Sequence, residues 1–190
     1  MIKINIEVKT LEIAGLASVL YALRLPFGKE CRSMSQSNFK WDGENGMTTH
    51  SISDVDPKDK QLLTTLIKRG DEHAKAIRGL IVWAEIKAPR YLWVELDTYK
   101  IGAERLSSES TMHIQGKGLS TEELIEMKEH LEEGTMQKRV EYYSYQTLRR
   151  IYFQRRNHRL PHWHKFCEWI ESLPFAAEWI TVDRKETGHE

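Results

Sequence analysis

The segment from Glu104 to His113 concentrates side chains that could bind a ligand or take part in a reaction. It contains hydroxyls, carboxylates and one guanidinium, with few apolar residues between them. A polar segment that directly follows a buried helix is a common place for functional residues, because the helix holds it in position. We therefore predict a binding or catalytic loop here. Composition alone favours the alternative of an ordinary solvated loop.

The helix expected before this loop starts at Pro89, whose missing N–H needs no partner in a first helical turn. Leu92, Trp93 and Leu96 form one apolar face of it, and Gly102 then interrupts the pattern. A stripe of this kind packs against a core. The helix would therefore hold the polar segment against the body of the protein.

A second group of chemically useful side chains lies in residues 149–159, where five arginines are interleaved with aromatic residues. Guanidinium groups bind phosphates, and aromatic rings can stack on a base, so this predicted helix could bind a nucleotide. Alternatively, the arginines pair with the glutamates of an acidic helix further upstream. Both explanations remain open. The glutamates are Glu122, Glu123, Glu126, Glu129, Glu132 and Glu133.

Two other chemistries are weakly supported. His158, His162 and His164 could be metal ligands, but Pro161 is expected to break the helix between the first two. No carboxylate or thiolate stands at ligand spacing nearby, so we predict no metal site. Ser110 lacks the G-x-S-x-G turn and the Ser–His–Asp order of a hydrolase.

Composition narrows the class of protein. The chain has 190 residues, of which 29% are charged, and its formal net charge is zero. No overall field therefore favours nucleic acid or a membrane surface, and no apolar run reaches the roughly 20 residues of a membrane span. Cys31 and Cys167 are far apart in sequence, which fits a reducing compartment. We expect a cytoplasmic protein.

Hydrophobic periodicity predicts one α/β (α+β) domain over residues 1–182, with a central sheet and long helices. The polar segment 29–53 is too long for a simple connection, so we predict a flap or mobile loop. Residues 183–190 are predicted to be a frayed tail. The predicted strands are 2–8 and 80–86; the predicted helices are 11–25, one from Pro57 that stops at Gly70, one from Pro89, 121–133, 146–159 and 161–173.

The motifs S-S-E-S-T-M-H, at residues 107–113, and R-R-N-H-R-L-P-H-W, at residues 155–163, occur in a familiar order of elements. This order resembles the flavin-dependent thymidylate synthase family, whose members carry R-H-R-x-x-S, then S-x-R-Y, and later L-R-x-x-x-x-A-Q-W-E-I-R. Ser110 matches the serine of S-x-R-Y. Arg156, seven residues before Trp163, matches the arginine of L-R. The resemblance extends from Leu62 to Leu173.

The chain departs from the family pattern at four places. Counted back from Ser110, Lys100-Ile101-Gly102 stands where the family has R-H-R. Met112 replaces the arginine that binds the nucleotide phosphate, His113 replaces the tyrosine, and Phe166 replaces the last arginine of the later motif. Loss of a phosphate-pairing arginine commonly costs several kcal/mol of binding. We therefore expect the scaffold to be kept and the synthase activity to be altered or lost.

The resemblance implies a homotetramer that binds flavin (FAD) and a uridine monophosphate where subunits meet, with reduced flavin supplying hydride. Arg105 is the candidate to replace a lost arginine. By this carry-over the site residues are Ser110 and Glu109 as catalytic, Arg105, Ser108, His113, Arg155 and Arg159 as nucleotide-binding, and Lys100 and Arg156 as cofactor-binding.

The leading hypothesis is thus a nucleotide-binding protein that is similar to flavin-dependent thymidylate synthases, with a small-molecule nucleotide and further copies of itself as partners. The alternatives are a non-catalytic protein that sequesters or senses a nucleotide, and an interaction protein that uses the basic helix. Bound flavin would favour the first hypothesis. Co-purification with a nucleotide but without flavin would favour the second, and salt-dependent polynucleotide binding the third.

Overall fold

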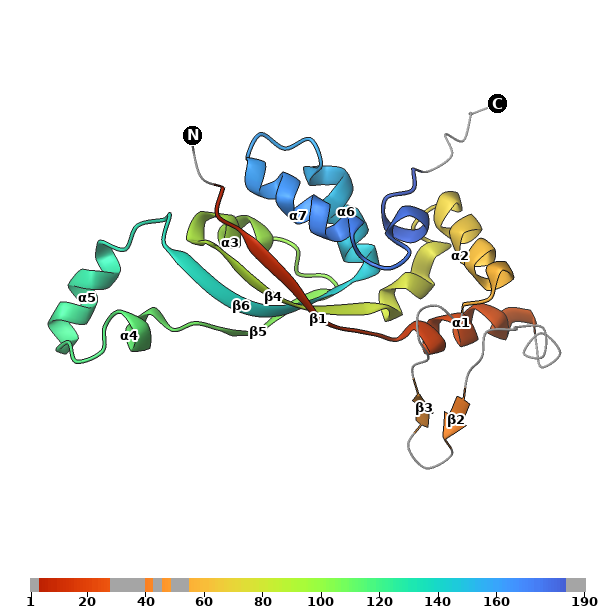
Figure 1. The fold of residues 1–190 in the computed structure, drawn as a ribbon, viewed down its shortest axis with the longest axis horizontal. Coiled ribbons are helices and arrows are strands. Elements are labelled where there is room, and N and C mark those ends of the chain that lie inside the picture. The colour runs from red at the N-terminus through yellow and green to blue at the C-terminus, as the bar shows by residue number, and fades with distance from the viewer. Residues whose placement is uncertain (1–3, 28–39, 43–45, 49–54, 184–190) are drawn as a thin grey trace.

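A four-stranded antiparallel sheet organises the fold. The computed structural model describes residues 4–27, 40–42, 46–48 and 55–183, with backbone only at 27, 40–42 and 46–48. The strand order is β1-β4-β6-β5 (Figure 1). The strands are β1 (Glu7–Ala14), β4 (Ile81–Pro89), β5 (Ala103–Ser108) and β6 (Met136–Ser144), and a separate short pair is β2 (Lys40–Asp42) with β3 (Gly46–Thr48).

The central strand β4 shows why one face of this sheet is buried. Val82, Ala84, Ile86 and Ala88 are each 0% exposed, whereas the residues between them, up to Lys87, are half-buried. Side chains alternate between the two faces of a strand, so these four all point to one side. Helices α3, α6 and α7 cover that side (Figure 1).

The helices pack their apolar stripes onto the buried face and onto each other. Trp93, Trp163, Trp179 and Phe166 are among the largest fully buried side chains of the core. The helices are α1 (Leu16–Arg24), α2 (Pro57–Arg69), α3 (Arg90–Leu96), α4 (Thr111–Ile114), α5 (Thr121–Glu129), α6 (Tyr145–Arg155) and α7 (Pro161–Glu171), with shorter turns η1 (Leu25–Phe27), η4 (Ala74–Gly79) and η5 (Ala176–Ile180).

The N-terminal boundaries differ from the prediction. The first strand runs to Ala14 instead of ending at residue 8, because residues 7–14 pair with β4. The predicted helix 11–25 therefore starts only at Leu16. Gly15 makes the turn between them with φ +95°, and a Cβ there would overlap the carbonyl oxygen of Gly79.

The polar segment 104–113 is not a loop. Residues 103–108 form β5, which pairs with β6, and Ser110 then caps the short helix α4. The prediction failed because β5 is an edge strand with five of its six residues exposed, so it lacks the apolar alternation that marks a half-buried strand. Its partner β6 was also not predicted.

The starts of α2, α5 and α7 lie where they were predicted, whereas the C-terminal ends of α5, α6 and α7 do not. Asp56 caps α2 by accepting a hydrogen bond from the Lys58 N–H at 2.7 Å, and α2 is followed by Gly70. The capping box of Ser120 and Glu123 is present, although α5 ends at Glu129 and not at 133. Likewise α6 and α7 end at Arg155 and Glu171, before the predicted ends at 159 and 173.

Two predicted segments lie largely outside the described residues. Of the expected flap at 29–53, the structure describes only β2 and β3, which pair with each other. Of the expected tail at 183–190, it describes only Asp183. The central expectation, a single α+β domain with a sheet and covering helices, is confirmed.

Candidate functional site

A cavity of about 1100 Å³ opens beside the first turn of α6. Its walls come from four parts of the chain: the turn before β5, α6 with its N-cap, the region around η4, and the segment after η5. The residues that line it are Asp71, Arg78, Ile101, Gly102, Ser144, Gln146, Thr147, Arg149, Arg150, Phe153, Gln154 and Asp183.

Hydroxyl groups fix the floor of the cavity. Ser144 is the N-cap of α6, and its Oγ accepts a hydrogen bond from the Thr147 N–H at 3.2 Å. The Thr147 hydroxyl donates to the carbonyl of Ile101 at 2.6 Å, and the Ser144 N–H donates to the carbonyl of Gly102 at 2.7 Å. These bonds hold the turn before β5 against the start of α6.

Gly102 is required at this contact. Its φ is +74°, a region that residues with a side chain rarely adopt, and a Cβ would lie 2.6 Å from both Ser144 Oγ and Thr147 Oγ1. The interruption of the helical pattern seen in the sequence therefore marks a close approach of two backbones at the cavity floor.

Arg78 and Arg150 give the cavity two exposed guanidinium groups. Arg78 donates from Nε to Gln146 Oε1 at 2.5 Å. The guanidinium carbon of Arg150 lies 5.6 Å from the centre of the Tyr99 ring. Neither forms an ion pair with any residue that the structure describes. A guanidinium that keeps free N–H donors in a cavity can bind a phosphate or a carboxylate.

The segment after η5 forms another wall and is attached to α6 by arginines. Arg149 is buried and donates from NH1 to the carbonyls of Ile180, at 2.6 Å, and Val182, at 2.5 Å. Arg156 lies 3.7 Å from the carboxylate of Asp183. The ring of Phe153 has the guanidinium carbons of Arg149 and Arg156 at 4.7 and 4.8 Å from its centre.

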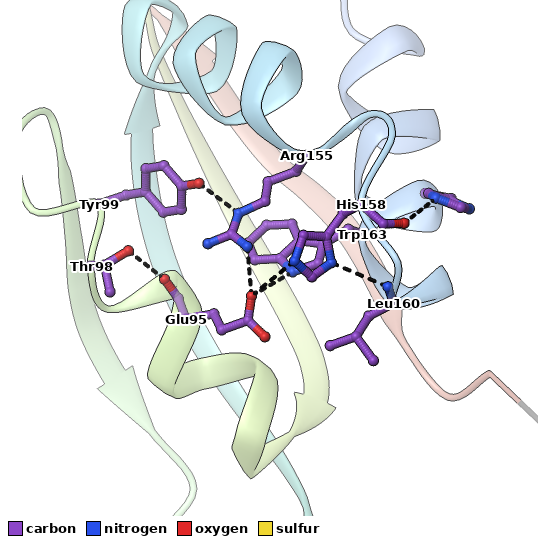
Figure 2. Close-up of polar contacts among 8 residues, drawn as sticks. Glu95, Thr98, Tyr99, Arg155, His158, Leu160 and Trp163 are labelled. Atoms are coloured by element: carbon purple, nitrogen blue, oxygen red, sulfur yellow. Dashed lines mark hydrogen bonds and ion pairs between the residues drawn. The ribbon is translucent and has the colours of Figure 1, made fainter.

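Glu95 organises a second polar cluster next to the cavity (Figure 2). Its Oε2 accepts hydrogen bonds from Arg155 NH1 at 2.7 Å and from Trp163 Nε1 at 2.9 Å. Arg155 also donates from Nε to the hydroxyl of Tyr99 at 2.8 Å, and its guanidinium lies over the Trp163 ring at 4.4 Å. The cluster joins α3 to the α6–α7 turn, so we assign Arg155 a structural role in this chain.

The arginines do not pair with the acidic helix of the same chain. Arg155 pairs with Glu95 and Arg156 with Asp183, while α5 lies at the far end of β5 and β6 (Figure 1). The expected pairing within the chain is therefore wrong. Sequence spacing cannot show it, because the partners come from elements far apart along the chain.

The predicted loop residues lie along β5 and at the start of α4. Arg105 and Ser108 are exposed on β5, and His113 is exposed on α4. Glu109 accepts a hydrogen bond from the Lys138 N–H at 2.8 Å, and Ser110 Oγ accepts one from the His113 N–H at 3.4 Å. In a single chain, Glu109 and Ser110 thus satisfy backbone groups.

The nine predicted site residues do not gather in the cavity. Ser108 lies at the opposite end of β5 from Gly102, and a six-residue strand spans roughly 20 Å. Lys100 is exposed next to Ile101 and Arg159 is exposed after α6, but neither lines the cavity. Arg156 is linked to the cavity through its ion pair with Asp183, which lines it.

Sequence reasoning missed several cavity residues as site candidates. Gln146 and Thr147 start α6, and Arg78 precedes the strand β4. Arg150 belongs to the arginine group of residues 149–159 but was not among the predicted site residues. The N-cap serine before the arginine-rich helix was the available signal, since a capped helix start presents N–H groups and the positive end of the helix dipole.

The three histidines have separate contacts. His158 Nδ1 accepts from the Leu160 N–H at 3.2 Å, His164 Nε2 lies 2.7 Å from the carbonyl of His158, and His162 Nε2 lies 3.1 Å from the Tyr91 hydroxyl. Burial lowers the pKa of His162. Among the described residues, no group of three His, Cys, Asp or Glu side chains could hold a metal ion.

Comparison with known proteins shows which solved structures share this fold. No family model and no curated protein matches the sequence. Solved structures do match. One is the flavin-dependent thymidylate synthase ThyX from Helicobacter pylori, solved with FAD and dUMP, which has a TM-score of 0.62 at 14% sequence identity. The match spans 93% of this chain and 97% of the ThyX chain. A second structure of that enzyme has a TM-score of 0.61 at 15% identity.

A third match is the UMP/dUMP methylase PolB from Streptomyces cacaoi, bound with 5-Br dUMP, with a TM-score of 0.58 at 12% identity and 95% coverage of this chain. The chain therefore has the fold of the flavin-dependent thymidylate synthases, and the expected resemblance is confirmed at the level of the fold. In the part of the chain that the structure describes, no helix is both long and apolar enough to cross a membrane.

Proposed function

We propose that this protein binds a pyrimidine nucleoside monophosphate in the cavity beside α6. The observation that carries the proposal is a pair of guanidinium groups, Arg78 and Arg150, that form no ion pair with the described residues, at a cavity that Phe153 also lines. Guanidinium groups suit a phosphate, and an aromatic wall suits a base. The H. pylori and S. cacaoi proteins of the same fold were solved with dUMP or its 5-bromo analogue.

A flavin is the cofactor that this fold implies, and the residues that line the cavity can be compared with what a flavin needs. Two arginines provide N–H donors, Phe153 lines the wall, and about 1100 Å³ is ample for an extended ligand. The donor set fits a flavin nucleotide. A flavin would use the same groups as the nucleotide, Arg78 and Arg150 for its phosphate and Phe153 beside its ring, so the two ligands are alternative occupants of this cavity. The bound flavin would supply hydride-transfer chemistry.

We also propose that Arg105, Ser108 and His113 contact the nucleotide. They are exposed on or beside β5 and far from the cavity of their own chain, so they could reach a ligand only from a neighbouring copy. We therefore include a homo-oligomer in the proposed function, as in the resemblance stated above. Lys100, Arg156 and Arg159 would contact ligand at the cavity rim.

Altered or absent synthase chemistry is the second part of the proposal. Glu109 and Ser110, the proposed catalytic pair, already bond to backbone N–H groups of Lys138 and His113. This observation favours the alternative of a protein that binds a nucleotide without converting it. A yellow protein that oxidises and reduces its flavin would support an enzyme, whereas nucleotide binding without flavin would support sequestration or sensing.

The binding proposal is tested by calorimetric titration with UMP, dUMP, inorganic phosphate and FAD. Arg150→Gln should weaken nucleotide binding by about 10- to 100-fold, because a hydrogen bond to a charged group contributes about 1.5–3 kcal/mol. Arg69→Gln, at the exposed end of α2, is the matched control and should bind like the original protein. Equal affinity of Arg150→Gln and the control would place the ligand elsewhere.

A further inference from the structure

The segment 109–135, here called the arm, extends beyond the end of β5 and β6 and carries α4 and α5 (Figure 1). Four apolar side chains on it face solvent: Met112 is 49% exposed, Ile114 60%, Leu119 37% and Ile125 54%. Single exposed apolar residues are ordinary, but several on one short segment mark a surface that is covered by another molecule.

The arm has little packing of its own. Neither α4 nor α5 has a buried residue, and the contacts between them are a Lys128–Thr111 hydrogen bond and the approach of Leu124 to Gly116. A nine-residue helix is marginal in water without tertiary packing of an apolar face. The exposed apolar side chains of the arm therefore favour a contact with another molecule.

Charge on the arm indicates what that occupant is. Residues 119–135 contain six glutamates against one lysine, one histidine and no arginine. Five of the glutamates are exposed and form no ion pair with the described part of the chain, while Glu123 closes the capping box. The occupant should present cations beside apolar or aromatic groups. The five are Glu122, Glu126, Glu129, Glu132 and Glu133.

The same chain carries the complementary surface. Residues 145–167, which span α6 and most of α7, contain five arginines, one lysine and no acidic residue. Arg159 and Lys165 are exposed and make no ion pair within the described ranges, and Arg156 is exposed beside the ring of Tyr152. We call the exposed Arg156, Arg159 and Lys165 the basic surface.

We propose that the arm of one copy docks on the basic surface of a second copy. Within one chain the arm extends away from α6 and α7 (Figure 1), so the complementary charges can meet only between chains. The two surfaces carry opposite charge, with glutamates on the arm and arginine and lysine on the basic surface. The inference rests on the homo-oligomer proposed above and names the surfaces that form it.

Charge reversal tests this pairing without any nucleotide. The molar mass is measured by light scattering on a sizing column for the original protein, for Glu126→Lys with Glu129→Lys, and for Arg159→Glu with Lys165→Glu. We expect an oligomer for the original protein, smaller species for each variant alone, and re-formation of the oligomer when the two variants are mixed. Added salt should shift the original protein toward smaller species.

The control is Glu12→Lys with Glu72→Lys, which reverses two exposed glutamates outside the arm and should leave the molar mass unchanged. Ile125→Ser tests the apolar part of the arm in the same way, and circular dichroism verifies folding of each variant. A monomeric original protein, an oligomer indifferent to the arm variants, or a mixture that fails to reassemble overturns the inference. Nucleotide titration of the Glu126→Lys, Glu129→Lys variant reports separately on Arg78 and Arg150, which line the cavity of a single chain.

Discussion

Arg155 and Glu95 form the central ion pair between α6 and α3, with 2.7 Å between NH1 and Oε2, and the same oxygen accepts the indole N–H of Trp163 (Figure 2). Both donors depend on one carboxylate. The pair connects the helix that carries the cavity arginines to the helix that follows β4. It therefore fixes the orientation of α6 against the sheet.

Replacement of this carboxylate should destabilise the fold. Glu95→Ala leaves the Arg155 guanidinium and the Trp163 N–H without their acceptor, at a cost of about 1–3 kcal/mol in the free energy of unfolding. Urea denaturation followed by tryptophan fluorescence measures it. Glu7→Ala, at an exposed position of β1, should change the same quantity by no more than about 0.5 kcal/mol. Equal losses in both variants would contradict a central role for Glu95.

The cavity floor should not tolerate a side chain at Gly102. In Gly102→Ala, the new Cβ meets Ser144 Oγ and Thr147 Oγ1 at 2.6 Å, and φ is +74°. A strained backbone of this kind costs about 1–3 kcal/mol. We expect a lower melting temperature and weaker nucleotide binding. Gly134→Ala is the control, since nothing lies within 4 Å of its added Cβ; a similar loss there would refute the steric explanation.

The thiol of Cys167 should be unreactive in the folded protein. Its side chain is buried in α7, and burial raises the pKa of the thiol to about 12, so almost no thiolate exists near neutral pH. A Cys31→Ser variant leaves Cys167 as the remaining one of two cysteines. Labelling with a chromogenic disulfide reagent should be slow until urea unfolds the protein. Fast labelling of the native variant would show that the thiol is accessible.

A buried acidic group should make stability depend on pH. Glu141 is 5% exposed and accepts the Tyr143 hydroxyl, and burial raises its pKa above the ordinary value of 4.5, although Arg139 nearby opposes the shift. Because the folded state holds this proton more tightly than the unfolded state, the contribution of Glu141 is present at low pH. It is lost as pH rises through the folded pKa.

Glu141→Gln removes that titration. Urea denaturation gives the unfolding free energy of each protein, and we compare the original protein with this variant at each pH. The difference should decrease in favour of the variant as the pH is raised from near 4.5 to neutral. Glu104→Gln changes a carboxylate on the exposed edge strand, where it accepts the Tyr142 hydroxyl, and is the comparison. Parallel stability curves for the original protein and Glu141→Gln would rule out the raised pKa.

Local features of the sequence were enough to predict several element ends and the fold class. Asp56 with Pro57, the Ser120–Glu123 capping box and Pro161 each act within one helical turn, so neighbouring residues alone determine them. Residues 80–86 were also predicted as a strand, and in the structure this central strand buries every second side chain. The resemblance to flavin-dependent thymidylate synthases depended on short motifs, and the fold comparison confirmed it.

Pairings between distant segments were decided only by the tertiary structure. β5 has no apolar alternation because it lies at the sheet edge, so only its hydrogen bonds to β6 reveal it as a strand. Arg155 meets Glu95 from 60 residues away, and the cavity collects side chains from positions 71 to 183. Such contacts form because burial of the core brings remote elements together, and no local spacing in the sequence records which of them will meet.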